Sequence, residues 1–162
     1  MKRAALLFTI IIAVITVPPS RAEYALDYST YFGGADNDEC YGLAVDGDDI
    51  CLTGRTRSLN FPTQNSFQAA SASDGVEWDA WVSRFGSDGS LIFSSYLGGE
   101  GEEWAFDIET AGGNAYVSGK TRSSDFPTVN PFQASNAGQF DFFYCAVDSA
   151  GGLTYSSYLG GS

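Results

Sequence analysis

The chain has 162 residues, of which 44% are hydrophobic, 15% aromatic and 17% charged, a composition typical of one globular domain. Its net charge of −12 at pH 7 repels a phosphate backbone and argues against nucleic acid as a partner. The absence of histidine from the sequence excludes Ser-His-Asp and Cys-His nucleophilic sites, acid–base catalysis by histidine and histidine metal sites.

Residues 1–22 have the pattern of a secretory signal peptide. Lys2 and Arg3 precede an apolar stretch over residues 4–17, and "SRA" at 20–22 supplies a small residue for cleavage before Glu23. The alternative is a membrane anchor, but this stretch of fourteen residues is shorter than the roughly 20 that a spanning helix needs. We therefore expect an exported protein, extracellular, surface-bound or periplasmic, with no membrane span after cleavage.

The remaining sequence contains an internal repeat. Residues 31–68 match residues 96–133 at a constant offset of 65, and residues 79–99 match residues 141–161 at an offset of 62. This match divides the chain into a lone strand over 23–34, a first repeat over 35–99, and a second repeat over 100–162 that includes the start of a further one. Such long-period repetition is typical of repeat architectures.

Each repeat predicts four β-strands in succession. In the first copy, Tyr41, Leu43 and Val45 alternate along the first strand. The turn "DGDD" (46–49) separates it from "ICLTGRT" (50–56), and a long loop then leads to "AWVSRF" (80–85) and "SLIFSSYLGG" (90–99). A four-stranded meander repeated in tandem is the unit of a β-propeller, which would be incomplete with two such units. The alternative fold is a two-sheet β-sandwich.

The combined motifs resemble a known family. The phrases "YSTYFGG", "YGLAVD", "TGRT", "NFPT", "DAWVSRF" and "DGSLIFSSYLGG" are similar to the bacterial beta-propeller repeat family abbreviated SBBP, over roughly residues 27–161. The resemblance implies exported or surface-associated bacterial proteins with many repeats, and it implies no enzyme activity or ligand. This chain has only two full repeats, so further blades or self-association are expected to close a ring, and the chain is interpreted as a fragment.

The long connections are expected to form the ligand face. Alternating strand direction places the loops between the second and third strands, and the links between repeats, at one end of each sheet. Loops on a rigid scaffold concentrate binding function. Charged and aromatic residues in these segments are the candidates for ligand contact: Asp36, Asp38, Glu39, Arg55, Arg57, Trp78, Glu102, Glu103, Trp104, Lys120 and Arg122.

Several of these residues have competing interpretations. Asp36, Asn37, Asp38 and Glu39 supply clustered oxygens that Ca²⁺ could use as a cofactor, although the second copy reads "EGEE" at 100–103. Trp78 and Trp104 could stack on sugar rings. Charges with the same sign in both copies instead indicate turn hydrogen bonds or partly solvated ion pairs that support the sheets.

The cysteines and the "FPT" segments are interpreted as structural. Cys40, Cys51 and Cys145 do not recur at equivalent positions, and the predicted hairpin places Cys51 near Ala44. Small semi-buried thiols are favoured, with a disulfide as the alternative. The "FPT" turns at 61–63 and 126–128 are expected to pin the long loops to the sheets through their phenylalanines.

Together these patterns predict a non-catalytic, exported repeat module for binding or surface display, with an unidentified protein or carbohydrate ligand. One alternative is a carbohydrate-active enzyme, a glycoside hydrolase or lyase, that uses paired carboxylates. Another is a purely architectural spacer.

Overall fold

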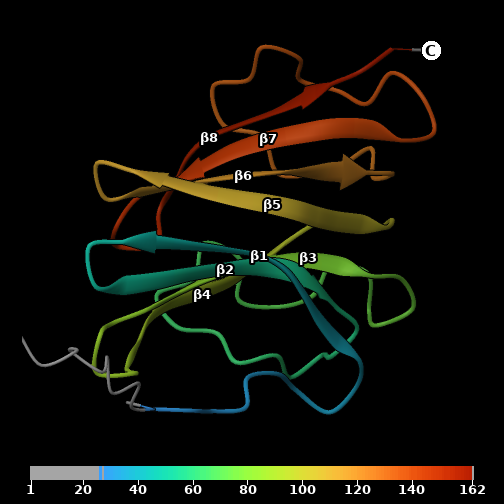
Figure 1. Ribbon diagram of the computed structural model, residues 1–162. Helices are drawn as coiled ribbons and strands as arrows, with labels where there is room; N and C mark the ends of the chain where they lie inside the picture. Colours follow the sequence, from blue (N-terminus) through green and yellow to red (C-terminus); the bar gives the residue numbers. More distant parts are fainter. Residues whose placement is uncertain (1–25, 27, 162) are drawn as a thin grey trace, which may run out of the picture.

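The computed structural model describes residue 26 and residues 28–161; the predicted signal peptide lies outside the described residues. The described part is all-β and contains no helix. Eight strands form two four-stranded antiparallel sheets, with the orders β1-β2-β3-β4 and β5-β6-β7-β8, which confirms the predicted meanders (Figure 1). The strands of the first sheet are β1 (Asp38–Asp46), β2 (Asp49–Thr56), β3 (Asp79–Phe85) and β4 (Leu91–Leu97). Those of the second are β5 (Glu103–Ala111), β6 (Asn114–Thr121), β7 (Asp141–Val147) and β8 (Leu153–Leu159).

A β-bulge occurs at the same place in both sheets. The register between the first two strands shifts between Cys40 and Gly42, and again between Ala105 and Asp107. Opposite the first bulge, a Cβ on Gly54 would overlap the backbone carbonyl of Glu39. A side chain at that position would therefore push the two strands apart, so the close approach of the backbones requires glycine.

The two sheets pack front to back. We call front face the side that carries Leu43, Ile50, Leu52, Trp81 and Phe85 in the first sheet and the equivalent Ile108, Ala115, Val117, Phe143 and Val147 in the second. We call back face the side that carries Cys51, Ala80, Val82, Phe93 and Leu97 in the first sheet and the equivalent Tyr116, Phe142, Tyr144, Tyr155 and Leu159 in the second. One hydrophobic core joins the back face of the first sheet to the front face of the second. Strand β5 lies against β1 and β2 at this interface.

Polar contacts also join the two sheets. The guanidinium of Arg84, 6% exposed, pairs with Asp46 at 2.7 Å and with Asp49 at 2.9 Å. Its remaining nitrogen donates to the carbonyl of Gly113 in the second sheet at 2.8 Å. Because both carboxylates come from the β1–β2 hairpin, this buried arginine fixes that hairpin and links it to the neighbouring one.

Residues 28–34 lie on the front face of the first sheet, on the side away from the second sheet (Figure 1). The ring of Phe32 contacts the rings of Phe61, Trp81 and Phe85 at centroid distances of 5.0, 5.9 and 4.9 Å. Phe32 is the repeat equivalent of Leu97, which belongs to the core that covers the front face of the second sheet. Residues 28–34 therefore cover the front face of the first sheet in the way that β4 covers the front face of the second sheet.

The long loops are fixed as predicted. Phe61 and Phe126 are each 3% exposed, and their backbone N–H groups donate to the hydroxyls of Tyr96 and Tyr158, both at 2.9 Å. The same contact in both repeats holds each long loop against the last strand of its own sheet. The predicted opposition of Cys51 and Ala44 is confirmed by the register of the first hairpin.

Candidate functional site

Two of the predicted ligand-face residues, Asp38 in β1 and Glu103 in β5, stabilise the turn that precedes their strand. Glu103 begins β5, and its Oε1 accepts hydrogen bonds from Thr121 Oγ1 at 2.6 Å and Ser123 Oγ at 2.5 Å. Its Oε2 accepts from the backbone N–H of Gly99 at 2.9 Å. The carboxyl thus closes the turn before β5 onto the end of β6.

Asp38 makes the equivalent contacts in the first sheet. Its carboxylate accepts from Thr56 Oγ1 at 2.5 Å, Ser58 Oγ at 3.1 Å and the N–H of Gly34 at 2.7 Å. An acid, two hydroxyls and a Gly-Gly pair therefore form one repeated structural unit, which agrees with the supporting role considered for these charges.

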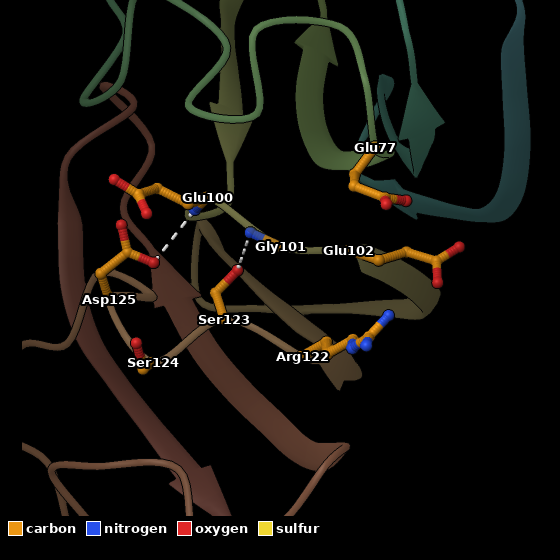
Figure 2. A pocket seen from close by; sticks show the side chains of 8 residues that line it. All are labelled: Glu77, Glu100, Gly101, Glu102, Arg122, Ser123, Ser124 and Asp125. Carbon is orange, nitrogen blue, oxygen red and sulfur yellow. Dashed lines mark hydrogen bonds between the residues drawn. The ribbon is translucent and has the colours of Figure 1, made fainter.

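A pocket of about 350 Å³ lies beside this unit at the junction of the two sheets. Figure 2 shows the eight residues that line it: Glu77, Glu100, Gly101, Glu102, Arg122, Ser123, Ser124 and Asp125. Two hydrogen bonds connect the segments that line it: the N–H of Glu100 donates to Asp125 Oδ1 at 3.0 Å, and the N–H of Gly101 donates to Ser123 Oγ at 2.8 Å. Four carboxylates and one guanidinium give the pocket an acidic lining.

A similar pocket of about 330 Å³ occupies the equivalent place in the first sheet. It is lined by Ala35, Asp36, Arg57, Ser58, Leu59, Asn60, Asp74 and Gly75. Two carboxylates and one guanidinium line it, so the two pockets are similar in volume but differ in charge. Of the predicted ligand-face residues, Asp36 and Arg57 line this pocket, and Glu102 and Arg122 line the acidic one.

Most of the other candidates form a ladder of alternating cations and aromatic rings across both sheets. The guanidinium of Arg55 lies 4.0 Å from the ring centroid of Trp78 and 3.9 Å from that of Trp104. The ladder continues with Arg57 4.8 Å from Trp78, and with Lys120 3.9 Å from Trp104. These cations cover the tryptophan rings that had been considered for sugar stacking, and the ladder joins the sheets.

The structure does not bring the four oxygen donors of the proposed Ca²⁺ site together. Asp38 and Glu39 are consecutive in β1 and so point to opposite faces. Glu39 pairs with Arg55 at 2.8 Å, and Asp36 Oδ1 accepts from the N–H of Asn37 at 2.7 Å. Within the described residues, no three acidic, histidine or cysteine side chains are grouped closely enough to hold a metal ion.

A buried pair of carboxyl groups was not predicted from the sequence. A Cβ placed on Gly98 would lie 2.5 Å from Asp79 Oδ1 and 2.6 Å from Glu103 Oε2, so the two groups converge on this glycine. Asp79 and Glu103 are 1% and 0% exposed, and Asp79 Oδ1 has no hydrogen-bond partner in the structure. The sequence signal was available, because an aspartate begins "DAWVSRF" and also "DFFYCAV".

Burial governs the protonation of this pair. It raises the pKa of Asp79, and hydrogen bonds from Ser71, Ser73 and Ala72 offset part of this rise. Burial likewise raises the pKa of Glu103, to which the nearby charge of Asp79 adds. The proximity of the two groups disfavours ionisation of both at once, since like charges in one buried site repel each other.

The structure places none of the three cysteines in a disulfide. All three are free thiols. Complete burial raises the pKa of Cys145 to about 12, so this thiol is protonated at neutral pH and unreactive. Burial also raises the pKa values of Cys51 and Cys40.

No model of a known protein family matches the chain, and neither does any curated protein sequence. In the part of the chain that the structure describes, no helix has the length and apolar character required to cross a membrane.

Proposed function

We propose that the chain is an exported, non-catalytic β-propeller repeat module, each sheet being one blade, which binds or displays ligands through its loop end. Front-to-back packing carries the proposal. Val82 lies in the core between the sheets, whereas its equivalent Tyr144 lies on the far side of the second sheet. The two sheets thus present unlike faces to each other, as successive blades do, and this supports a propeller over a sandwich in which two equivalent faces meet.

The loop end is the favoured binding face because repeated pockets lie there. Each is built from the turn that enters a first strand and the loop that leaves a second strand. The hairpins at the opposite end are short. The rigid junctions formed by Asp38 and Glu103 hold the pocket walls, so loop residues can vary in charge without changing the scaffold.

A binding screen tests this proposal. The purified chain is incubated with arrays of polysaccharides and peptides, beside Glu100→Lys in the acidic pocket and Asp48→Lys in the first hairpin, both at exposed positions. These two variants change the net charge equally. We expect any bound probe to lose at least tenfold in affinity with Glu100→Lys and to keep its affinity with Asp48→Lys.

The same screen separates the alternatives. Equal losses with both variants would contradict binding at the loop end. Cleavage of a polysaccharide would favour the carbohydrate-active enzyme. Retention of no probe at all would favour the architectural spacer.

A further inference from the structure

The back face of the second sheet is apolar, and the part of the chain that the structure describes leaves it exposed. Phe142, Tyr144 and Leu159 are 58%, 42% and 59% exposed, whereas the equivalent Ala80, Val82 and Leu97 in the first sheet are each 0% exposed. The ring of Tyr144 stacks on that of Tyr116 at 6.3 Å. The equivalent face of the first sheet is thus covered by a neighbouring sheet, whereas this face of the second sheet is exposed.

The front face of the first sheet has a complementary opening. A hollow of about 490 Å³ lies between the segment 28–32 and strands β1 and β2, with Leu43, Ile50 and Leu52 in its wall. Leu43 is 63% exposed, and its equivalent Ile108 is 2% exposed because the back face of the first sheet covers it. In the second sheet, the corresponding space is filled by apolar side chains from the first sheet, such as Cys51 and Val82. No such side chains from the described residues fill the hollow.

Residues 28–34 lie where the fourth strand of a preceding sheet would lie, and the described residues form no further strands of such a sheet. Tyr31 is fully exposed, whereas the equivalent Tyr96 and Tyr158 are each 1% exposed. Those two tyrosines donate their hydroxyls to the carbonyls of Ser58 at 2.5 Å and Ser123 at 2.9 Å. Phe32 already contacts the front face, so among the described residues the segment occupies the position of a fourth strand beside which no third strand is paired.

We propose that a second copy of the chain covers this front face, docking on it the back face of its own strands β5, β6 and β7. Residues 28–34 of the first copy then lie beside β7 of the second copy, where β8 otherwise lies. The interface continues the packing that already joins the two sheets. Because it uses different surfaces on the two copies, it is heterologous and propagates into a closed ring or an open chain.

Exchange of the fourth strand is compatible with the sequence. Residues 28–34 read "YSTYFGG", and residues 155–161 read "YSSYLGG". The incoming segment thus supplies a tyrosine hydroxyl at the position of Tyr158. It also brings the same backbone donors and acceptors to the edge of β7, so the hydrogen bonds that β8 makes there can form with the new strand.

Asp141 provides a second link. It is the equivalent of Asp79, and its Oδ1 is likewise buried without a partner among the described residues. Docking places Asp38 of the first copy opposite Asp141 of the second copy, as Glu103 lies opposite Asp79 in the existing interface. The new interface therefore repeats the arrangement in which Glu103 and Asp79 converge on Gly98.

Analytical ultracentrifugation of complementary variants tests the proposal. Leu43→Lys alters only the front face and Tyr144→Lys only the back face, both at exposed positions. Leu59→Lys is the matched control, since Leu59 is also 63% exposed but lies at the loop end. We expect the wild type and Leu59→Lys to form multiples of the chain mass, each face variant alone to be monomeric, and an equal mixture of the two to form one-to-one dimers only. A monomeric wild type at about 100 μM would overturn the proposal, as would self-association of either face variant or a mixture that stays monomeric.

A disulfide trap tests the strand register independently. In β8, Ser156 lies opposite Cys145 and Ser157 opposite Tyr144, so the proposed exchange places Ser29 opposite Cys145 and Thr30 opposite Tyr144. In a Cys40→Ser background, we expect Ser29→Cys to form an intermolecular 29–145 disulfide under mild oxidation and Thr30→Cys to form none. Peptide mapping that finds no 29–145 link, or equal cross-linking of both variants, would contradict the proposed strand position.

Discussion

The two sheets follow one sequence plan but differ in what lies in front of them. The front of the second sheet is covered by the first sheet, whereas the front of the first sheet is covered, among the described residues, by the segment 28–34 alone. Leu43 and Ile108 are similar in size and equivalent in position, yet the exposed fractions are 63% and 2%. Asp38 is partly buried, whereas Glu103, with the same three kinds of donor, is fully buried. The neighbouring sheet, more than residue type, therefore decides which residues form the core.

Equivalent core truncations test this difference most strongly. Ile108→Ala removes a side chain from the packed interface, and we expect it to lower the free energy of unfolding by about 3 kcal/mol. Leu43→Ala removes an exposed side chain and is expected to cost about 0.5 kcal/mol. Urea denaturation at low protein concentration measures both. Equal losses of stability in the two variants would mean that Leu43 and Ile108 are buried to the same extent, which would contradict this difference.

Removal of the junction acids is the next test. Glu103→Ala leaves two buried hydroxyls and the N–H of Gly99 without their acceptor, so we expect a loss of about 2 kcal/mol. Asp38→Ala is expected to cost about 1 kcal/mol, because water reaches its partly buried partners. Thermal unfolding of the two variants compares them, and a larger loss at Asp38 would refute the assigned difference in burial.

The cation–aromatic ladder gives a third comparison. Arg55 lies between two tryptophan rings, one from each repeat, whereas Lys120 lies near the rings of Trp104 and Phe140 of its own repeat. We expect Arg55→Ala to destabilise the protein by about 1.5 kcal/mol and Lys120→Ala by about 0.5 kcal/mol. Tryptophan fluorescence should change more with Arg55→Ala. Similar spectra for both variants would argue against the shared stacking between sheets.

The buried carboxyl pair predicts a dependence of stability on pH. Because the folded state raises the pKa values of Asp79 and Glu103, the folded protein binds more protons than the unfolded chain between the unfolded and folded pKa values. Stability therefore falls as pH rises through this interval, and acidification from pH 7 to about 5 should raise Tm.

Asp79→Asn should raise Tm at pH 7 by about 3 °C, since its amide removes one charge and offers a donor to Glu103. This variant should also weaken the pH dependence. Asp141→Asn is the control at a protein concentration low enough to keep the chain monomeric, because at Gly160 the nearest atoms within one copy all belong to Asp141. A pH dependence unchanged by Asp79→Asn would show that the pair does not carry it.

The strands and turns could be predicted from sequence because they depend on local alternation and on glycine. The predicted strand over 50–56 differs from β2 by one residue, and the opposition of Cys51 and Ala44 follows from the hairpin alone. The bulge at Tyr41 was not predicted, because the strand was inferred from a regular alternation of inward and outward side chains, and a bulge interrupts this alternation.

Contacts between repeats could not be predicted from either repeat alone. Asp79 and Glu103 lie in different repeats, and only the front-to-back packing brings them together at Gly98. Trp78 and Trp104 were correctly placed at the loop end, but their ring faces are covered by Arg55, which the sequence gives no reason to place between them. Aromatic residues at the loop end therefore indicate a ligand face only where no neighbouring cation covers their rings.

Nuclear Overhauser effects from Ile108 test the front-to-back packing most directly. A Cβ on Gly42 would lie 3.0 Å from Cγ2 of Ile108, so the Ile108 methyl group should show a strong effect to the α-protons of Gly42 on the back face of the first sheet. Packing of the two front faces against each other would instead connect Ile108 to the methyl groups of Leu43 and Leu52. A strong Ile108–Gly42 signal without those to Leu43 and Leu52 is the predicted result, and the reverse pattern would contradict the account.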